Sequence, residues 1–504
     1  MKNISRREFL KKGTLAAAGL TIVPGSVMGK AFGFTAPSDK LNIAGIGIGG
    51  MGRRNLANMN TENIVALCDV DWAYADKTFK DYPKAAKFKD WRVMFDKMGK
   101  SIDAIMVATP DHTHAGVTAH AITLGKHCYT QKPLTHSVYE SRLLTKLTEK
   151  HKVATQMGNQ GNSFDWCRQV SEWIQAGVIG DVYEVHCWTD RPIWPQGLSQ
   201  PKGEMPIPAT LDWDLWVGPA QMRPYHSAYV PWNWRGFWDF GTGALGDMAC
   251  HIMDPVFWAL DLKYPDSVIA SSTLSNLYSP PTAQIVTYTF PERPAKGMVK
   301  MPAVKVLWYD GGLMPDRPAE LKDGEMMGDS NGGIIFIGTK GKIMTGCYGM
   351  NPTLLPLSAM DHFNQPTPHI PRVKGGNMDI WSSNAHEQDW IRACKESPEN
   401  RTEATSNFKF SGPFNEMVVM GVLATRLSGL QGLHRELKWD GENMRFTNIS
   451  PNDKIKIVTV DDYAVIDGDP RFDRRFADFN AAEMAQEWIK HTYQNGFALP
   501  DMPV

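Results

Sequence analysis

Asp247 and His251 lie four positions apart in the stretch GTGALGDMACHIMD, and both side chains can do chemistry. On a helix this spacing brings the two Cβ atoms to about 5–6 Å from each other on one face. A carboxylate beside an imidazole has three interpretations: part of a metal site, a proton-transfer pair, or an ordinary helix turn. The choice depends on what the rest of the chain places in front of them.

A glycine-rich turn is the clearest motif elsewhere in the chain. The stretch KLNIAGIGIGGMGRRNL contains Gly47-x-Gly49-x-x-Gly52, and an overlapping register includes Gly50. An apolar strand precedes the turn and a helix start follows it, which is the context of a dinucleotide-binding motif. Without Cβ atoms the backbone can approach a pyrophosphate, and the helix N-terminus supplies amide donors to it.

Asp69 closes the second strand, NIVALCDVD, twenty residues beyond Gly49. An acid at this position accepts hydrogen bonds from ribose hydroxyls. It also repels a 2′-phosphate, and the next Lys or Arg along the sequence is Lys77. The sequence therefore predicts NAD(H) as the cofactor in preference to NADP(H).

Two more predicted strands end in polar residues. The stretch ATPDHTH puts Thr109 and Pro110 at the carboxyl end of a central strand, where open α/β sheets bind ligands. Beside them, His114 faces either the cofactor or the helix start, and Asp111 has the chemistry of a helix N-cap. The stretch CYTQKPLTHS places Lys132 at the same edge, held extended by the following proline. An ammonium near a nicotinamide ring would stabilise a developing alkoxide.

The order of strands and helices predicts the fold. Up to about residue 177 they alternate, which indicates an α/β domain with a doubly wound parallel sheet. Helical patterns in this part cover 113–124, 138–150 and 165–176. Beyond it, alternating strands with few helices predict an α+β domain with a large open, mostly antiparallel sheet. We expect a signal and linker over 1–35, a NAD-binding Rossmann domain over 36–177, and a substrate-binding and oligomerisation domain over 178–504.

The N-terminus has the pattern of an export signal. SRREFLKKG precedes a short apolar run, TLAAAGLTIVPGSVMG. A twin arginine before such a run resembles a Tat signal, which predicts an exported, periplasmic protein. Tat-type export moves folded proteins, so a cofactor acquired in the cytosol would travel with the chain.

Composition excludes several classes of partner. The 504 residues carry 53 basic and 54 acidic side chains, which argues against nucleic acid or an anionic membrane as the partner. Beyond the N-terminus there is no apolar run long enough for a membrane span, so none is expected in the mature chain. The seven cysteines form no CxxC pair, so zinc-ribbon and thioredoxin spacings are absent.

The sequence resembles the Gfo/Idh/MocA oxidoreductase family in four motifs and in their order along the chain: the glycine turn, ATPDHTHAG, QKPL and GDMACH. The resemblance implies a Rossmann domain followed by an open-sheet domain, NAD(P)-dependent chemistry on a sugar or polyol, and a homodimer or homotetramer. It also implies that Lys132 is catalytic, that Asp247 binds substrate and orients the site, and that His251 is the general acid/base. In several exported members the dinucleotide is tightly bound, so the resemblance implies a tightly bound NAD(H) here. The family usually has Glu before the lysine, whereas this chain has Gln131, which can hydrogen-bond a cofactor hydroxyl but carries no charge.

With a nicotinamide in front of them, Asp247 and His251 are best explained as a proton-transfer pair. Oxidation of an alcohol needs a base near the carbinol oxygen, and the ordinary pKa of histidine suits that task. A zinc site needs a third ligand at a suitable spacing, and neither His-Glu-x-x-His nor a Cys/His cluster is present, so no metal is expected.

Tryptophans are dense between residues 188 and 238, above all in PWNWRGFWDFG. Sugars present apolar C–H faces to aromatic rings, while their hydroxyls need polar partners. We expect at least half of these tryptophans to be core. The predicted substrate-binding residues are Asp190, Trp234, Arg235 and Tyr309.

Two activities fit these residues. One is an NAD(H)-dependent oxidoreductase that moves a hydride between a hydroxyl carbon of a sugar or glycoside and a tightly bound nicotinamide. The other is a redox-neutral glycoside hydrolase that oxidises, eliminates, hydrates and reduces again. A non-catalytic sugar-binding relative is a third interpretation, and the intact Lys132, Asp247 and His251 argue against it.

Overall fold

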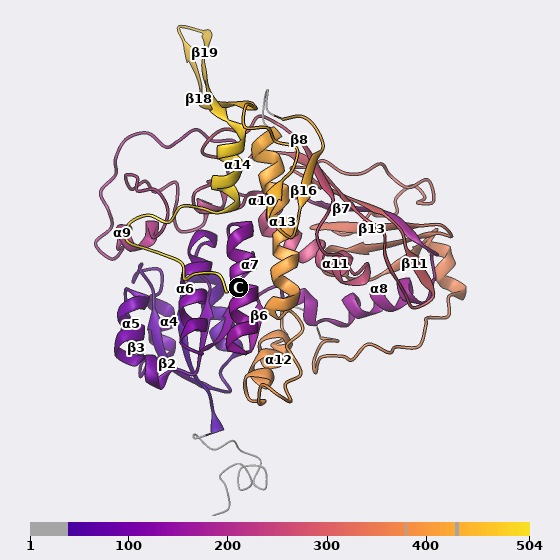
Figure 1. Cartoon of the computed structure of the whole chain (residues 1–504), viewed down its shortest axis with the longest axis horizontal. Coiled ribbons are helices and arrows are strands. Elements are labelled where there is room, and N and C mark those ends of the chain that lie inside the picture. Colours follow the sequence, from indigo (N-terminus) through magenta and orange to yellow (C-terminus); the bar gives the residue numbers. More distant parts are fainter. Residues whose placement is uncertain (1–38, 379–380, 429–432, 504) are drawn as a thin grey trace, which may run out of the picture.

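The computed structural model describes residues 39–378, 381–428 and 433–503 (Figure 1). The predicted signal and linker, 1–35, lie outside the described residues. Among the helices of the described ranges, none combines the length and the hydropathy needed to cross a membrane.

The N-terminal half is built on a six-stranded sheet in the order β3-β2-β1-β4-β5-β6. All its neighbouring strands are parallel. The strands are β1 (Asn42–Ile46), β2 (Asn63–Cys68), β3 (Ala86–Phe88), β4 (Ala104–Val107), β5 (His127–Thr130) and β6 (Thr155–Met157). The order reverses between β1 and β4, so the crevice for a dinucleotide opens at the carboxyl ends of these strands. We call this part the Rossmann half.

Helices follow these strands: α3 (Gly50–Asn58), α4 (Asp76–Asp81), α5 (Trp91–Met98), α6 (Asp111–Thr123), α7 (Val138–His151) and, after the last strand, α8 (Asp165–Gln175). The three helices predicted from the sequence correspond to α6, α7 and α8. A capping box fixes the start of α7, because Ser137 Oγ accepts the amide of Glu140 and the Glu140 carboxylate accepts the amide of Ser137. The strand β3 was not predicted, since its three residues are too short for a recognisable pattern.

The C-terminal half contains a nine-stranded sheet in the order β15-β14-β13-β7-β12-β9-β8-β16-β17. The pair β7 and β12 is parallel and the other pairs are antiparallel, so the predicted sheet type is confirmed. Its strands are β7 (Val182–Thr189), β8 (Ser267–Ser272), β9 (Gln284–Phe290), β12 (Val304–Asp310), β13 (Gly332–Gly338), β14 (Lys342–Gly346), β15 (Thr353–Leu355), β16 (Leu437–Asp440) and β17 (Arg445–Phe446). In β9 every second residue is buried, as expected for a sheet covered on one face.

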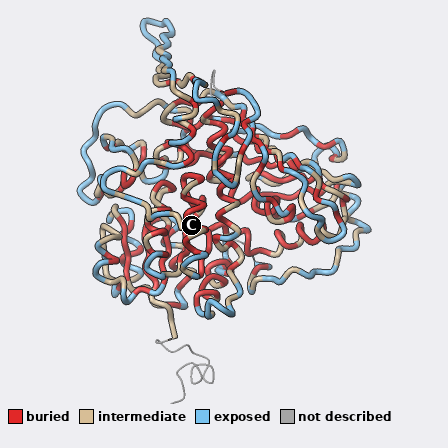
Figure 2. The backbone as a smooth tube through the Cα atoms, in the orientation of Figure 1, coloured by how far each residue is buried: buried red, intermediate tan, exposed pale blue. Residues whose placement is uncertain are grey.

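The helices of this half are α9 (Trp213–Val217), α10 (Gly243–Ile252), α11 (Asp254–Ala259), α12 (Ala385–Cys394), α13 (Phe408–Ser428) and α14 (Ala481–Ile489). Short 3-10 turns are η2 (Gly99–Ser101), η3 (Gln160–Ser163), η4 (Asn233–Gly236), η5 (Cys347–Gly349) and η6 (Leu357–His362). The long helix α13 packs on α7, and α12 shares a hydrophobic cluster with β1 and β4. The two halves therefore have a continuous buried interior (Figure 2).

Two hairpins complete the chain: β10 (Arg293–Lys296) with β11 (Val299–Met301), and β18 (Lys454–Ile466) with β19 (Asp469–Asn480). The second projects from the body beyond α14 (Figure 1). The sequence predicted a helix from 481 to 495, but α14 ends at Ile489, and Lys490 is extended with φ −138° and ψ 96°. The residues that follow run back toward the Rossmann half.

Candidate functional site

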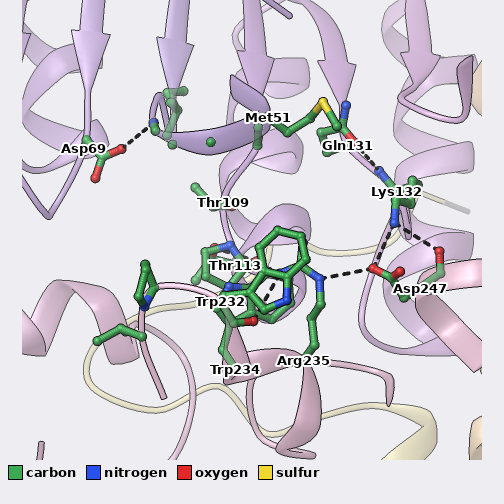
Figure 3. Close-up of a pocket in the computed structure, with 18 of the residues that line it drawn as sticks. Met51, Asp69, Thr109, Thr113, Gln131, Lys132, Trp232, Trp234, Arg235 and Asp247 are labelled. Carbon is green, nitrogen blue, oxygen red and sulfur yellow. Dashed lines mark hydrogen bonds and ion pairs between the residues drawn. The ribbon is translucent and has the colours of Figure 1, made fainter. Parts of the chain in front are cut away.

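A cavity of about 510 Å³ lies at the carboxyl ends of the Rossmann strands and is covered by the C-terminal half. This volume is in the range of pockets that hold small molecules and cofactors. The predicted site residues that line it are Gly47, Gly49, Gly50, Asp69, Thr109, Pro110, Gln131, Lys132, Trp234, Arg235, Asp247 and His251. Residues from both halves therefore share one cavity (Figure 3).

The glycine turn is packed so closely that side chains are excluded. Gly47 has a φ of +74°, and an added Cβ would lie 2.7 Å from the backbone of Ala108 and Thr109. At Gly52 a Cβ would lie 2.0 Å from Gly47 O, so Gly52 closes the packing of α3 against β1 instead of lining the cavity. The turn thus meets the cavity through Gly47, Gly49 and Gly50.

Asp69 both lines the cavity and holds the turn. Its Oδ2 accepts the amides of Ile48 at 2.8 Å and Gly49 at 3.3 Å, and its Oδ1 accepts the amide of Asp71 at 2.9 Å. Burial raises the pKa of this carboxyl to about 6, and these amide donors oppose the rise. A carboxylate offers about four acceptor directions, so Asp69 retains capacity for a ribose hydroxyl.

The residues present fit a dinucleotide. Thr109 lines the cavity, and its Oγ1 is buried without a hydrogen-bond partner among the described residues. Leaving such a group unpaired costs roughly 1–3 kcal/mol, which a ligand would recover. The helix α3 begins at the turn, and no side chain caps its N-terminus, so the positive end of its dipole lies beside the cavity.

Three side chains at the Asp69 end were not predicted: Tyr74, Lys89 and Trp91 all line the cavity. The Tyr74 ring lies against Gly49, where an added Cβ would be 2.2 Å from Tyr74 Cδ1. Lys89 and Trp91 follow β3, the strand that the sequence pattern missed. A cation therefore lies near Asp69 in space although none follows it closely along the chain.

Lys132 and Asp247 form an ion pair between the two halves. Lys132 Nζ donates to Asp247 Oδ1 at 2.9 Å and to its main-chain oxygen at 3.0 Å, and Arg235 Nε donates to the same Oδ1 at 3.2 Å (Figure 3). Burial alone would raise the pKa of Asp247, but the charges of Lys132 and Arg235 outweigh it and hold the pKa well below its usual value. Asp247 is therefore an ionised carboxylate shared by two cations.

His251 follows Asp247 by one turn of α10, and its side chain lines the same cavity. It is 5% exposed, and its Nδ1 has no hydrogen-bond partner in the described part of the chain. Burial, followed by the charge of Lys132, holds its pKa well below 6.5, so the ring is neutral at neutral pH. A neutral imidazole with an unpaired nitrogen can accept a proton.

Tyr348 packs beside His251 and was also not predicted. The ring centroids are 4.8 Å apart, and Tyr348 lines the cavity. Its φ of +64° is in the left-handed region, which bulky residues rarely adopt and which clusters at functional sites. Gly161 makes room for it, because a Cβ there would lie 2.9 Å from Tyr348 Cδ1.

Arg235 lies against two tryptophans. Its guanidinium carbon is 4.0 Å from the ring centroid of Trp232 and 4.2 Å from that of Trp234. Trp232 is 48% exposed, whereas the other tryptophans between residues 188 and 238 are buried, so the expectation that at least half are core is confirmed. Trp234 therefore supports Arg235 from the cavity wall.

Two predicted substrate-binding residues do not reach the cavity. Asp190 is exposed and pairs with Arg191, and it is Arg191 that lines the cavity. The sequence prediction for Asp190 was therefore wrong by one position, because successive side chains beyond a strand end can face opposite sides. Tyr309 packs with Trp188 and bonds His186 Nδ1 through its hydroxyl at 3.0 Å.

His114 and Asp111, which follow β4, make structural hydrogen bonds outside the cavity. His114 lies outside the cavity lining, with its ring nitrogens 2.8 Å from Pro133 O and Thr109 O. Burial lowers its pKa to about 4, so the neutral ring donates to one of these carbonyls. Asp111 is not an N-cap, because it is the first residue of α6 and accepts the amide and hydroxyl of Thr242.

Gln131 takes part in a buried amide chain. Its Nε2 donates to Asn55 Oδ1 at 2.9 Å, and Asn55 Nδ2 donates to Glu387 Oε1 at 2.8 Å. The Glu387 carboxylate therefore lies one amide group away from Gln131. A second carboxylate, at position 131, would face Asn55 Oδ1, which is itself an acceptor. Glutamine at this position is therefore matched to Glu387. In the described ranges, no group of three or more His, Cys, Asp or Glu side chains could hold a metal ion.

Comparisons with known proteins agree with this architecture. A family model described as the NAD-binding Rossmann fold of the Gfo/Idh/MocA oxidoreductase family matches residues 41–159, and the model of its C-terminal alpha/beta domain matches residues 183–290. Glycosyl hydrolase family 109 protein 1 from Shewanella sp. (strain ANA-3) is 25% identical over 210 residues. These are 36% of this chain and 45% of that relative, so the chain spans about half the length of the curated relatives it matches.

Solved structures with the same fold include the WlbA dehydrogenase from Bordetella pertussis in complex with NADH and UDP-GlcNAcA. It has a TM-score of 0.51 and 16% identity, over 77% of this chain and 97% of that one. An inositol dehydrogenase homolog from Azotobacter vinelandii, complexed with NADH and myo-inositol, has a TM-score of 0.51 and 15% identity, over 79% and 98%. Both domain models of the Gfo/Idh/MocA oxidoreductase family are thus matched, in order along the chain, within residues 41–290.

Proposed function

We propose that this protein is an NAD(H)-dependent oxidoreductase that moves a hydride between a hydroxyl carbon of a sugar or glycoside and a nicotinamide. The observation that carries the proposal is the meeting of Lys132, Asp247 and His251 in the cavity that the glycine turn lines. The NADH and sugar ligands of the structural relatives support the same class of substrate.

Each side chain has a role that follows from its protonation. When bound, the nicotinamide supplies the hydride acceptor. The neutral His251 accepts the proton of the substrate hydroxyl, while Lys132 Nζ donates to the same oxygen and stabilises its developing charge. Asp247 orients Lys132 and, as an anion one helix turn from His251, favours the imidazolium that forms.

Tight retention of the cofactor is part of the proposal. The segment before α9 is tied to the strand end that carries Asp69: the amide of Trp72 donates to Thr210 O at 3.2 Å, and the amide of Asp212 donates to Val70 O at 2.9 Å. These bonds hold the segment against the strand end, and its Leu211 lines the cavity. A cofactor retained in this way suits export through the twin-arginine segment and a homodimeric or homotetrameric enzyme, both of which rest on the sequence.

A redox-neutral glycoside hydrolase is the second candidate. The family 109 relative supports it, and so does Tyr348, because elimination and hydration need a second proton-carrying group near His251. Both reactions begin with the same oxidation, so the same three residues are required.

The experiment that separates the candidates uses purified protein loaded with NAD⁺. Absorbance at 340 nm is recorded while myo-inositol, D-glucose or p-nitrophenyl α-N-acetylgalactosaminide is added. A rise at 340 nm with an oxidised sugar product supports the oxidoreductase, and release of p-nitrophenol without net NADH supports the hydrolase. His251→Asn should lower kcat by about 10²–10⁴ while NADH still binds. Unchanged kcat in this variant would remove the assignment of His251.

A further inference from the structure

The last residues of the chain line one end of the cofactor cavity. Residues 490–503, here called the C-terminal strap, leave α14 and return to the Rossmann half (Figure 1). Tyr493 and Phe497 of this strap line the same cavity as Gly47 and Asp69. Neither family model extends into these residues, since the matches end at 159 and 290.

Specific contacts hold the C-terminal strap in place. Tyr493 Oη donates to Glu140 Oε1 of α7 at 2.8 Å, and the amide of Gln494 donates to Pro219 O at 2.9 Å. Asn495 Nδ2 donates to Gly218 O at 2.8 Å and lies 2.9 Å from Ala220 O. The strap is therefore fixed to a Rossmann helix on one side and to the segment after α9 on the other.

The two aromatic side chains of the strap are also packed against Rossmann helices. The Phe497 ring centroid is 4.4 Å from the guanidinium carbon of Arg92 at the start of α5. On α6, a Cβ added to Gly116 would lie 3.6 Å from Tyr493 Cε2, so a glycine there admits the tyrosine ring at van der Waals distance. The Phe497 ring therefore lies at the start of α5, and the Tyr493 ring lies against α6 with its hydroxyl bonded to α7.

The position of the strap relative to the order of the Rossmann strands indicates which half of a dinucleotide it contacts. Asp69 ends β2 and is the acid that such folds use for the adenosine ribose. Trp91 follows β3, the next strand outward, and lines the cavity there, whereas Lys132 follows β5 on the opposite side of the switch point. Since Phe497 contacts Arg92, the strap lies at the Trp91 end of the cavity.

We propose that Tyr493 and Phe497 of the C-terminal strap, together with Trp91, enclose the adenine ring and retain the dinucleotide. Adenine is a flat aromatic group, and aromatic side chains bind such rings by stacking and edge contacts. The inference rests on the proposed function only in taking a dinucleotide as the ligand. It assigns a binding role to a segment more than 300 residues from the Rossmann motif in sequence.

The test compares two cofactors with full-length variants. Phe497→Ala removes one wall of the adenine site, and Phe472→Ala, at a position 74% exposed on the β18–β19 hairpin, is the matched control. The dissociation rate of bound NADH and the affinity for reduced nicotinamide mononucleotide, which lacks the adenosine half, are measured by fluorescence. In Phe497→Ala, NADH should leave about tenfold faster while the mononucleotide binds as before. Tyr493→Phe keeps the ring and should retain most of the NADH affinity, and Phe472→Ala should change neither quantity.

Three outcomes would overturn the inference. They are an unchanged NADH rate in Phe497→Ala, an equal loss of NADH and mononucleotide affinity, or an equal effect of Phe472→Ala. A wild-type protein that binds NADH through the strap but oxidises no sugar would sink the proposed function and leave this inference standing.

Discussion

Lys132 Nζ donates to both the carboxylate and the main-chain oxygen of Asp247, and this ion pair joins the two halves of the chain at the cavity. The lysine follows β5 of the Rossmann half, and the aspartate lies on α10. Both side chains are 14% exposed, so loss of either one leaves its partner charged in a place that water barely reaches.

Lys132→Met should therefore affect catalysis and pH dependence together. Loss of the donor to the reacting oxygen should lower kcat by at least about 10². The charge of Lys132 lowers the pKa of His251, so its removal should raise that pKa. Because His251 must be neutral to accept a proton, the acid limb of the kcat/KM profile should move to higher pH. Lys132→Arg keeps the charge, so an equal pH shift in that variant would contradict the explanation.

The parts of this site that the sequence predicted depend on local patterns. The spacing of the glycines, the polar residues at strand ends and the i, i+4 pair on α10 are all set within a few residues. Tyr348 and Phe497 carry no such signal, since they reach the cavity through contacts with residues far away in the chain. Lys89 was missed because the strand before it has three residues.

The predicted role of Asp111 failed for a physical reason. The helix α6 begins at Asp111 itself, so Pro110 is its N-cap, and the buried Asp111 carboxylate accepts the hydroxyl of Thr242 across the interface of the two halves. A sequence pattern gives the residue type and the helix start, and it does not reveal what covers the first turn.

Asp111→Asn should change how stability depends on pH. Burial raises the pKa of Asp111 from 3.8 to about 7, so between these values the folded chain holds a proton that the unfolded chain has released. The contribution of Asp111 to the free energy of unfolding is fully present below about pH 4 and is lost as the pH rises through 7. The variant should therefore gain on the order of a few kcal/mol relative to wild type between pH 5 and pH 8, measured by urea unfolding. Burial also raises the pKa of Asp310 to about 7, so the stability difference for Asp310→Asn should show the same trend with pH, from a lower baseline, because both Asp310 oxygens accept hydrogen bonds that an amide nitrogen cannot accept. A difference that is flat with pH for both variants would contradict the argument.

Gln131→Glu should destabilise the fold. The new carboxylate would face Asn55 Oδ1 and lie one amide from Glu387, so a buried acceptor would lose its donor at a cost of about 1–3 kcal/mol. We expect the melting temperature to fall by a few degrees. In the double variant Gln131→Glu, Glu387→Gln, the carboxylate is exchanged for the amide and part of the loss should return. Purely additive losses in this double-mutant cycle would mean that the amide chain does not couple the two positions.

Asp69→Asn should shift cofactor preference toward NADP⁺. Asparagine keeps an oxygen for the amides of Ile48 and Gly49 but removes the charge that repels a 2′-phosphate. With Lys89 facing the same end of the cavity, NADP⁺ affinity relative to NAD⁺ should rise about tenfold, measured by isothermal titration calorimetry. The double variant Asp69→Asn, Lys89→Ala should lose most of this gain. An equal gain in the single and the double variant would show that Lys89 does not contact the 2′-phosphate. Because the pKa of Asp69 is about 6, discrimination in the wild type should also weaken as the pH falls below 6, and Asp69→Asn should lack that component.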